Sequence, residues 1–210
     1  MTQQRIAWWA ILLPMTAVVV WSLNIVVTRY VTDFIEPMSI SFYRWLLAWL
    51  LLTPFMLHKT WQQRQLIQQH SLKLAILSAF GMLLYQGLAY SAAHYTTATN
   101  MGLINAFIPI FTIFVGILIL KEFPNRYAVI GSICSFLGLL YVLGQGQFDA
   151  ILNLGQHTGD LLMLLAVFFY AFYGVFLRKW QLALPLMLML YVQVCFALLY
   201  HVPIIVYFGL

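Results

Sequence analysis

The chain has 210 residues, of which 64% are hydrophobic and 7% are charged. Soluble domains carry about 25% charged residues, so this composition excludes a soluble domain and predicts an integral membrane protein. Ten lysines and arginines outweigh five acidic residues. In a membrane protein such an excess reports on orientation, so we expect the lipid bilayer as partner and no nucleic acid.

Seven apolar segments follow one another along the chain. They are 7–28, 37–57, 74–93, 98–120, 127–144, 161–177 and 183–207. A bilayer with a hydrocarbon core about 30 Å thick is crossed by helices of roughly this length. We therefore predict an all-α multi-span bundle with short connections, the longest being the stretches 58–73 and 144–160.

Most of the basic residues fall on one side of the predicted bundle. With the N-terminus in the cytoplasm, only Arg29 lies at an outer end, and Arg44 lies within the second span. The inner residues are Arg5, Lys59, Arg64, Lys73, Lys121, Arg126, Arg178 and Lys179. Because cytoplasmic loops are enriched in Lys and Arg, this distribution predicts a multi-pass protein of the inner (plasma) membrane with a cytoplasmic N-terminus.

The fourth predicted span combines small, polar and helix-breaking residues. Small side chains recur at every fourth position, at Ala98, Gly102 and Ala106, and predict a flat face for close helix packing. Pro109 has no N–H, so the carbonyl of Asn105 loses its helical partner. Polar groups at this depth must be satisfied by protein, water or a ligand. A helix–helix hydrogen bond with a packing kink is the alternative to a binding role.

The first and sixth spans share a weak pattern. Trp21–Asn24 followed by Arg29 corresponds to Tyr170–Tyr173 followed by Arg178, 149 residues later. A repeat of five spans is odd in number, so the second copy would enter from the opposite face of the membrane. Such inverted repeats are typical of secondary transporters, whose site lies near the midplane. We expect a first repeat at 7–144, a periplasmic linker at 145–160 and the start of a second repeat at 161–210.

Several stretches together resemble the EamA family of the drug/metabolite transporter superfamily. They are WSLNIVVTRYV at 21–31, FYRWLLAWLLL at 42–52, LAYSAAHYTTATNMGLINAFIPIFTIFVGILILKE at 88–122, IGSICSFLGLLYVL at 130–143 and Gly159-Asp160-Leu161. The resemblance implies ten helices in two five-helix repeats and export or exchange of small metabolites. Full members of the family are longer, so we expect a C-terminally truncated chain with helices eight to ten missing.

Polar and aromatic side chains from several spans fall at similar depths in the membrane. Counted at about 1.5 Å per residue, those within about 6 Å of the centre are Trp21, Gln86, Asn105 and Tyr170. This layer is extended by Asn24, Tyr85, Tyr90 and Tyr173. Aromatic faces with a few amides suit a small amphipathic molecule, such as an amino acid or a drug-like amine. Ordinary aromatic packing is the alternative, above all for Tyr85 and Tyr173.

Three charged residues are candidates for binding or gating. Arg44 lies about 10 Å below the outer end of its span, where an arginine is costly. We expect it to attract an anion such as a substrate carboxylate or to hold Asp33 or Glu36 at an outer gate, with snorkelling to the headgroups as the alternative. Lys121 and Glu122 end the fourth span at the cytoplasmic face, where they either anchor the helix or take part in an inner gate.

These features favour an exporter or exchanger of small metabolites, most of all amino acids or related amphipathic compounds, that works by alternating access. An intramembrane enzyme is the less favoured rival, because the sequence has no HExxH or GxSxG motif and Gly159-Asp160 is isolated at a membrane edge. We expect no cofactor or metal. A truncated protein that only associates with a partner is the other alternative. The small-residue face at 128–138 predicts packing on the fourth span or on a second copy, in a homodimer.

Overall fold

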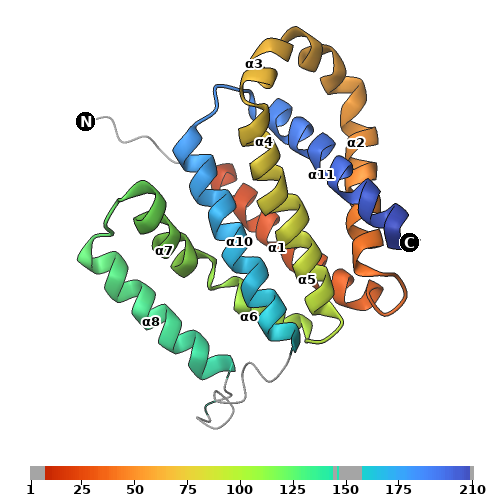
Figure 1. Cartoon of the computed structure of the whole chain (residues 1–210). Coiled ribbons are helices and arrows are strands. Elements are labelled where there is room, and N and C mark those ends of the chain that lie inside the picture. Colours follow the sequence, from red (N-terminus) through yellow and green to blue (C-terminus); the bar gives the residue numbers. More distant parts are fainter. Residues whose placement is uncertain (1–7, 144–145, 147–157, 209–210) are drawn as a thin grey trace.

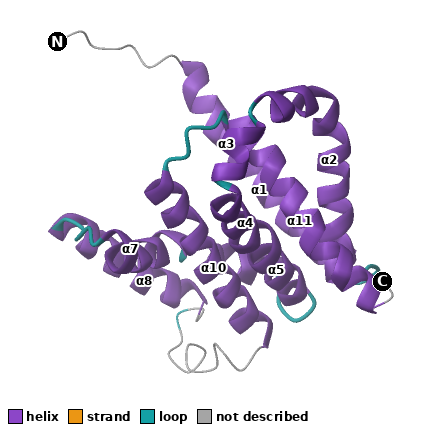
Figure 2. Ribbon diagram, turned by 45° about the horizontal axis from the view of Figure 1, so that its top comes forward, coloured by secondary structure: helices purple, strands orange, loops and turns teal. Residues whose placement is uncertain are grey.

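The structure is a computed structural model that describes residues 8–143, 146 and 158–208. The elements are α1 (Trp8–Val31), α2 (Pro37–Gln62), α3 (Arg64–Gln69), α4 (Ser71–Ser78), the π-helix η1 (Ala79–Leu84), α5 (Tyr85–Ala93), α6 (Ala98–Asn105), α7 (Ile108–Leu120), α8 (Arg126–Leu143), α10 (Thr158–Trp180) and α11 (Leu186–Phe208). Every regular element in these ranges is helical (Figures 1 and 2), which confirms the all-α prediction. Most of the predicted linker, 145–160, lies outside the described residues.

Six helical stretches in the described part of the chain are long and apolar enough to cross a membrane. They are Leu12–Val31, Pro37–Gln62, Ser71–Ala93, Ala98–Leu120, Thr158–Trp180 and Leu186–Tyr207. The seventh predicted span corresponds to α8, whose apolar stretch Arg126–Gly138 is shorter. The chain is therefore a multi-pass membrane protein.

Helix α10 lies in the middle of the bundle. It packs against α4, η1, α5, α6 and α7, while α11 packs against α2, α4 and η1 on another side (Figure 1). Helix α1 contacts α5 and α6, and α8 contacts α6 and α7. Consequently α1 lies beside α5 and α6, which are far from it in the sequence.

The largest buried cluster joins α5, α6 and α10. Its members are Tyr85, Ala89, Ala92, Ala93, Met101, Ile104, Phe107, Met163, Ala166 and Val167. Four of them are alanines, and small residues let helix backbones approach closely within a membrane. Because lipid tails are as apolar as these side chains, van der Waals packing rather than hydrophobic burial holds the three helices together.

The third membrane-spanning stretch is interrupted by the π-helix η1. A π-turn holds an extra residue, and one residue corresponds to about 100° of rotation on a helix. Thus Leu74 on α4 packs into the cluster around Leu188 on α11, whereas Tyr85 on α5 belongs to the cluster with α6 and α10. The carbonyl of Met82 within η1 accepts a hydrogen bond from Trp45 Nε1 at 3.2 Å. One span thereby presents different faces above and below the π-turn.

The fourth span is broken rather than kinked. Helix α6 ends at Asn105 and α7 begins at Ile108, with Ala106 and Phe107 in a turn between them. Pro109 is the second residue of α7, where a missing N–H costs no helical hydrogen bond. In place of the packing kink that was the alternative interpretation of this span, the structure thus has a turn between two helices.

The two small-residue faces predicted as packing seams are open in the structure. Gly102 and Ala106 are exposed, and a Cβ at Gly102 would meet no described atom within 4 Å. The same is true of Gly131 and Gly138 on α8. Tight packing of these faces within the chain is thus not observed among the described residues, and packing of α8 on a second copy stays a prediction.

Candidate functional site

A polar and aromatic cavity lies between α1, α2, α5, α6 and α10. Its wider part has a volume of about 430 Å³ and is lined by Ala17, Val20, Trp21, Asn24, Arg44, Tyr85, Gln86 and Tyr170. A narrower part of about 40 Å³ shares five of these residues and continues to Ile25, Thr28, Ala89, Tyr90, Met101, Asn105 and Met163. We call the two parts together the central cavity.

Most of the predicted binding residues line the central cavity. They are Trp21, Asn24, Arg44, Tyr85, Gln86, Tyr90, Asn105 and Tyr170. Tyr173 does not line it, but its ring stacks on that of Tyr170 with centroids 5.5 Å apart. The structure thus brings together side chains from five helices, and their binding of a substrate stays a prediction.

Arg44 is an exposed residue that lines the cavity, and the groups that it contacts there are neutral. Its Nη1 donates hydrogen bonds to Gln86 Oε1 at 3.0 Å and to the hydroxyl of Tyr90. The guanidinium carbon also lies 5.2 Å from the centre of the Trp45 ring. Arg44 has no ion pair among the described residues: Asp33 is paired with Arg29 at 2.6 Å, and Glu36 forms no ion pair there either. The expectation that Arg44 holds Asp33 or Glu36 is therefore not met in this structure, whereas its attraction of a substrate carboxylate stays a prediction.

Aromatic rings from α1, α5 and α10 form one wall of the cavity. The ring centroid of Tyr170 lies 4.6 Å from that of Tyr85 and 6.4 Å from that of Trp21. The hydroxyl of Tyr85 donates to Asn105 Oδ1 at 3.3 Å. The Asn105 amide therefore lines the cavity, as a binding role requires, and also forms a hydrogen bond between helices, as the alternative role in packing requires.

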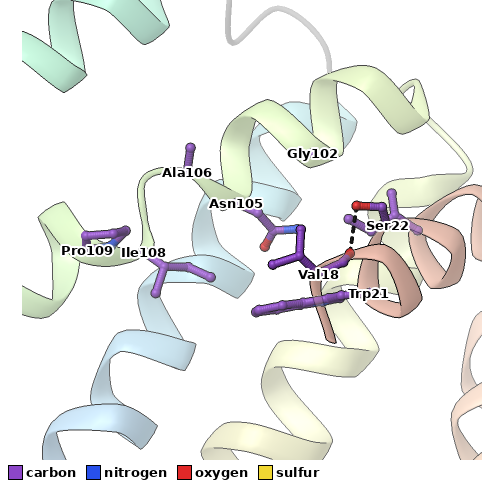
Figure 3. A pocket seen from close by; sticks show the side chains of 9 residues that line it. Val18, Trp21, Ser22, Gly102, Asn105, Ala106, Ile108 and Pro109 are labelled. Carbon is purple, nitrogen blue, oxygen red and sulfur yellow. Dashed lines mark hydrogen bonds between the residues drawn. The ribbon is translucent and has the colours of Figure 1, made fainter. Parts of the chain in front are cut away.

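A second hollow opens beside the central cavity, between α1 and the α6–α7 turn (Figure 3). It measures about 560 Å³ and is lined mainly by apolar atoms of Val18, Trp21, Ser22, Ile25, Gly102, Asn105, Ala106, Ile108 and Pro109. The Ser22 hydroxyl is bonded back to the carbonyl of Val18 at 2.9 Å. Trp21, Ile25 and Asn105 border both spaces, so they separate the polar cavity from this apolar side hollow.

The predicted gate residues lie where α7 ends. Lys121 terminates the helix in the left-handed region, with φ of 57°. Glu122 forms an ion pair of 2.6 Å with Arg178 at the end of α10. Lys179 donates to the carbonyl of Ile119 at 3.3 Å. Two cations of α10 thus hold the end of α7, a pairing between distant helices that sequence reasoning did not identify.

Asp160 is a buried polar residue whose partners were also missed. It is 2% exposed, and its Oδ1 accepts hydrogen bonds from the Thr96 hydroxyl and, at 3.4 Å, from Asn100 Nδ2. Its Oδ2 has no partner among the described residues. This clasp joins the start of α10 to the turn between α5 and α6. A Gly-Asp pair directly before an apolar run was the available signal, because acidic residues are favoured in the first turn of a helix.

A comparison with known proteins places the chain in a family. Residues 8–144 match the model of the EamA-like transporter family. The chain belongs to this family. The EamA match covers the stretches from Trp21 to Leu143 that suggested the resemblance. Among the described residues no group of three or more His, Cys, Asp or Glu is placed to hold a metal ion.

The relatives found among curated proteins are named as uncharacterized transporters. The chain is 24% identical over 151 residues to YyaM of Bacillus subtilis (strain 168), covering 72% of this chain and 50% of that protein. It is 26% identical over 168 residues to a protein of Archaeoglobus fulgidus, covering 79% and 55%. The chain spans about half the length of the curated relatives it matches. No solved structure matches it.

Proposed function

We propose that this chain is a secondary transporter of the inner membrane that exports or exchanges small amphipathic metabolites, most of all amino acids and related compounds. The observation that carries the proposal is the central cavity, which gathers rings, amides and one guanidinium from separate helices. Such a lining binds the apolar body of a ligand on aromatic faces and orients it through a few polar groups. Amides within a membrane are costly unless they are used.

The internal repeat supports a site between two halves of the chain. Trp21 and Tyr170 occupy corresponding places in the proposed repeats 7–144 and 161–210. The centroids of their rings lie 6.4 Å apart. In inverted-repeat transporters the substrate lies where the repeats meet, and the repeats rock against each other around it. The distribution of basic residues supports a cytoplasmic N-terminus.

The ion pair between Glu122 and Arg178 is proposed as part of an inner gate. It joins the ends of α7 and α10, and the hollow of about 190 Å³ beside it is lined by both residues. Both side chains are more than half exposed, so solvent weakens the attraction. A weak contact of this kind is compatible with repeated opening and closing.

Replacing Asn105 with leucine is expected to lower transport about tenfold, because the Tyr85 hydrogen bond and a cavity amide are lost together. The measurement uses cells that express the chain and are challenged with a panel of toxic amino acid analogues and amines, with the internal concentration of each compound determined. Gln68→Leu is the matched control, since Gln68 is an exposed amide on α3, outside the cavity.

Two outcomes would contradict the proposal in different ways. Unchanged export by Asn105→Leu, at the same amount of protein in the membrane, would place the site outside the central cavity. Failure of the unmodified chain to change the internal concentration of any compound would favour the alternative, a membrane protein that only associates with a partner.

A further inference from the structure

We propose that the central cavity selects organic carboxylates and rejects organic cations; the inference rests on the proposed function and names the substrate class of that same site. Its starting point is the charge of the lining. Among the residues that line the two parts of the cavity, Arg44 is the one charged side chain, and none is acidic. The cavity therefore carries one uncompensated positive charge.

The contacts of Arg44 leave this charge available. Both of its hydrogen bonds among the described residues start from Nη1 and end on neutral atoms of Gln86 and Tyr90. The Nη2 and Nε donors remain for a further partner, and a carboxylate binds the planar guanidinium through two parallel hydrogen bonds. The Trp45 ring at 5.2 Å supplies only a quadrupole, which attracts a cation more weakly than a full negative charge does. The Arg44 guanidinium therefore has hydrogen-bond donors free to bind an anion.

The free-energy cost of leaving the Arg44 guanidinium unpaired determines whether anions or cations are preferred. A charge inside a membrane is expensive unless an opposite charge accompanies it. A carboxylate that enters the cavity removes this cost, whereas an ammonium group adds a second positive charge in a medium of low dielectric constant. The rings of Trp21, Tyr85 and Tyr170 accept the apolar body of either ligand equally well. The charged end of the ligand thus decides which one binds.

The test compares three probes that share a phenyl ring on a short alkyl chain: 3-phenylpropanoate, the neutral 3-phenylpropanamide and phenethylamine. Binding to the purified chain in nanodiscs is measured by isothermal titration calorimetry. We expect the carboxylate to bind at least about tenfold more tightly than the amide, since a hydrogen bond to a charged group is the stronger one, and the amine to bind most weakly.

Variants at two arginines test whether Arg44 causes the preference for the carboxylate. Arg44→Gln is expected to bring the carboxylate and the amide to the same affinity, and Arg44→Lys to give an intermediate preference, because lysine keeps the charge and loses the planar fork. Arg29→Gln is the matched control, since Arg29 is paired with Asp33 outside the cavity. Helical content and a monodisperse elution profile establish that each variant folds.

The outcomes separate this inference from the proposed function. Equal or tighter binding of the amine, a carboxylate preference that survives Arg44→Gln in folded protein, or no binding of any probe at millimolar concentration would each overturn the inference. Counterflow in proteoliposomes tests transport independently. Binding in the expected order without counterflow would refute only the transporter, and counterflow of the amine in preference to the carboxylate would refute only the carboxylate selectivity.

Discussion

Replacing Gly159 with alanine is expected to destabilise the protein by about 3 kcal/mol, the upper end of the range for overpacked sites. A Cβ at this position would lie 2.6 Å from the carbonyl carbon of Tyr95, 2.8 Å from the amide nitrogen of Thr96 and 2.9 Å from the carbonyl oxygen of Ala92. All three obstacles are backbone atoms, so no side chain can rotate out of the way. The start of α10 must separate from the α5–α6 turn, and the hydrogen bond between Thr96 and Asp160 would be lost as well.

The measurement is the free energy of unfolding in mixed micelles, followed by helical circular dichroism. Gly174→Ala is the matched control on the same helix, because a Cβ there meets no described atom within 4 Å. Alanine is the better helix former by up to about 1 kcal/mol, so this control is expected to be neutral or slightly stabilising. Equal stability of the two variants would show that α10 does not approach the turn as closely as the structure indicates.

A second large effect is expected at Gly81 within the π-helix. A Cβ there would lie 2.7 Å from Cδ2 and 3.0 Å from Cγ of the Tyr173 ring. That ring stacks on Tyr170, which lines the central cavity. Because atoms close to the tyrosine backbone cannot move far, Gly81→Ala is expected to cost about 2 kcal/mol of unfolding free energy.

Two comparisons make the Gly81 prediction specific. At Gly87 the overlap is similar, 2.8 Å, but the atom met is the terminal methyl of the flexible Met38. Gly87→Ala should therefore cost less than about 0.5 kcal/mol, as substitutions without a fixed obstacle do. In a Tyr173→Leu background the obstructing ring is absent, and Gly81→Ala should then cost at least about 1 kcal/mol less than in the unmodified chain. Additive costs of the two substitutions would contradict the contact.

The positions of the helices follow largely from local sequence. An apolar run of about twenty residues has one stable structure in lipid, since every backbone polar group must be satisfied within the segment. The predicted spans 37–57, 161–177 and 183–207 accordingly fall on α2, α10 and α11. The π-turn at Ala79–Leu84 was not predicted, because side chains of other helices, such as Trp45, bind the carbonyls that a π-turn releases.

In the candidate site, too, the sequence predicts some features and not others. Counting residues from the middle of each span placed Trp21, Gln86, Asn105 and Tyr170 at one depth, and all four line the central cavity. Depth follows from the helical rise, whereas the partner of a polar group depends on how helices rotate and pack. For this reason the sequence did not predict that Arg44 contacts Gln86 and Tyr90 rather than Asp33 or Glu36.

Two further contacts were missed for the same reason. Asp160 is bound by Thr96 and Asn100, and Glu122 is paired with Arg178, so each contact joins residues more than fifty positions apart. No local pattern records such a pairing. The clasp at Asp160 is the more consequential of the two, because its carboxylate is buried and its partners hold the start of α10 in place.

The proposed transport requires that water reaches the central cavity, which residues of α1 border, and cysteine labelling tests this requirement most directly. In a chain carrying Cys134→Ser and Cys195→Ser, a single cysteine replaces either Asn24, which lines the cavity, or its neighbour Leu23, which is exposed but does not. Thiols react as thiolates, which require water. A charged thiol reagent should therefore modify Asn24→Cys at least about tenfold faster than Leu23→Cys. Equal rates, or faster modification of Leu23→Cys, would contradict a hydrated cavity.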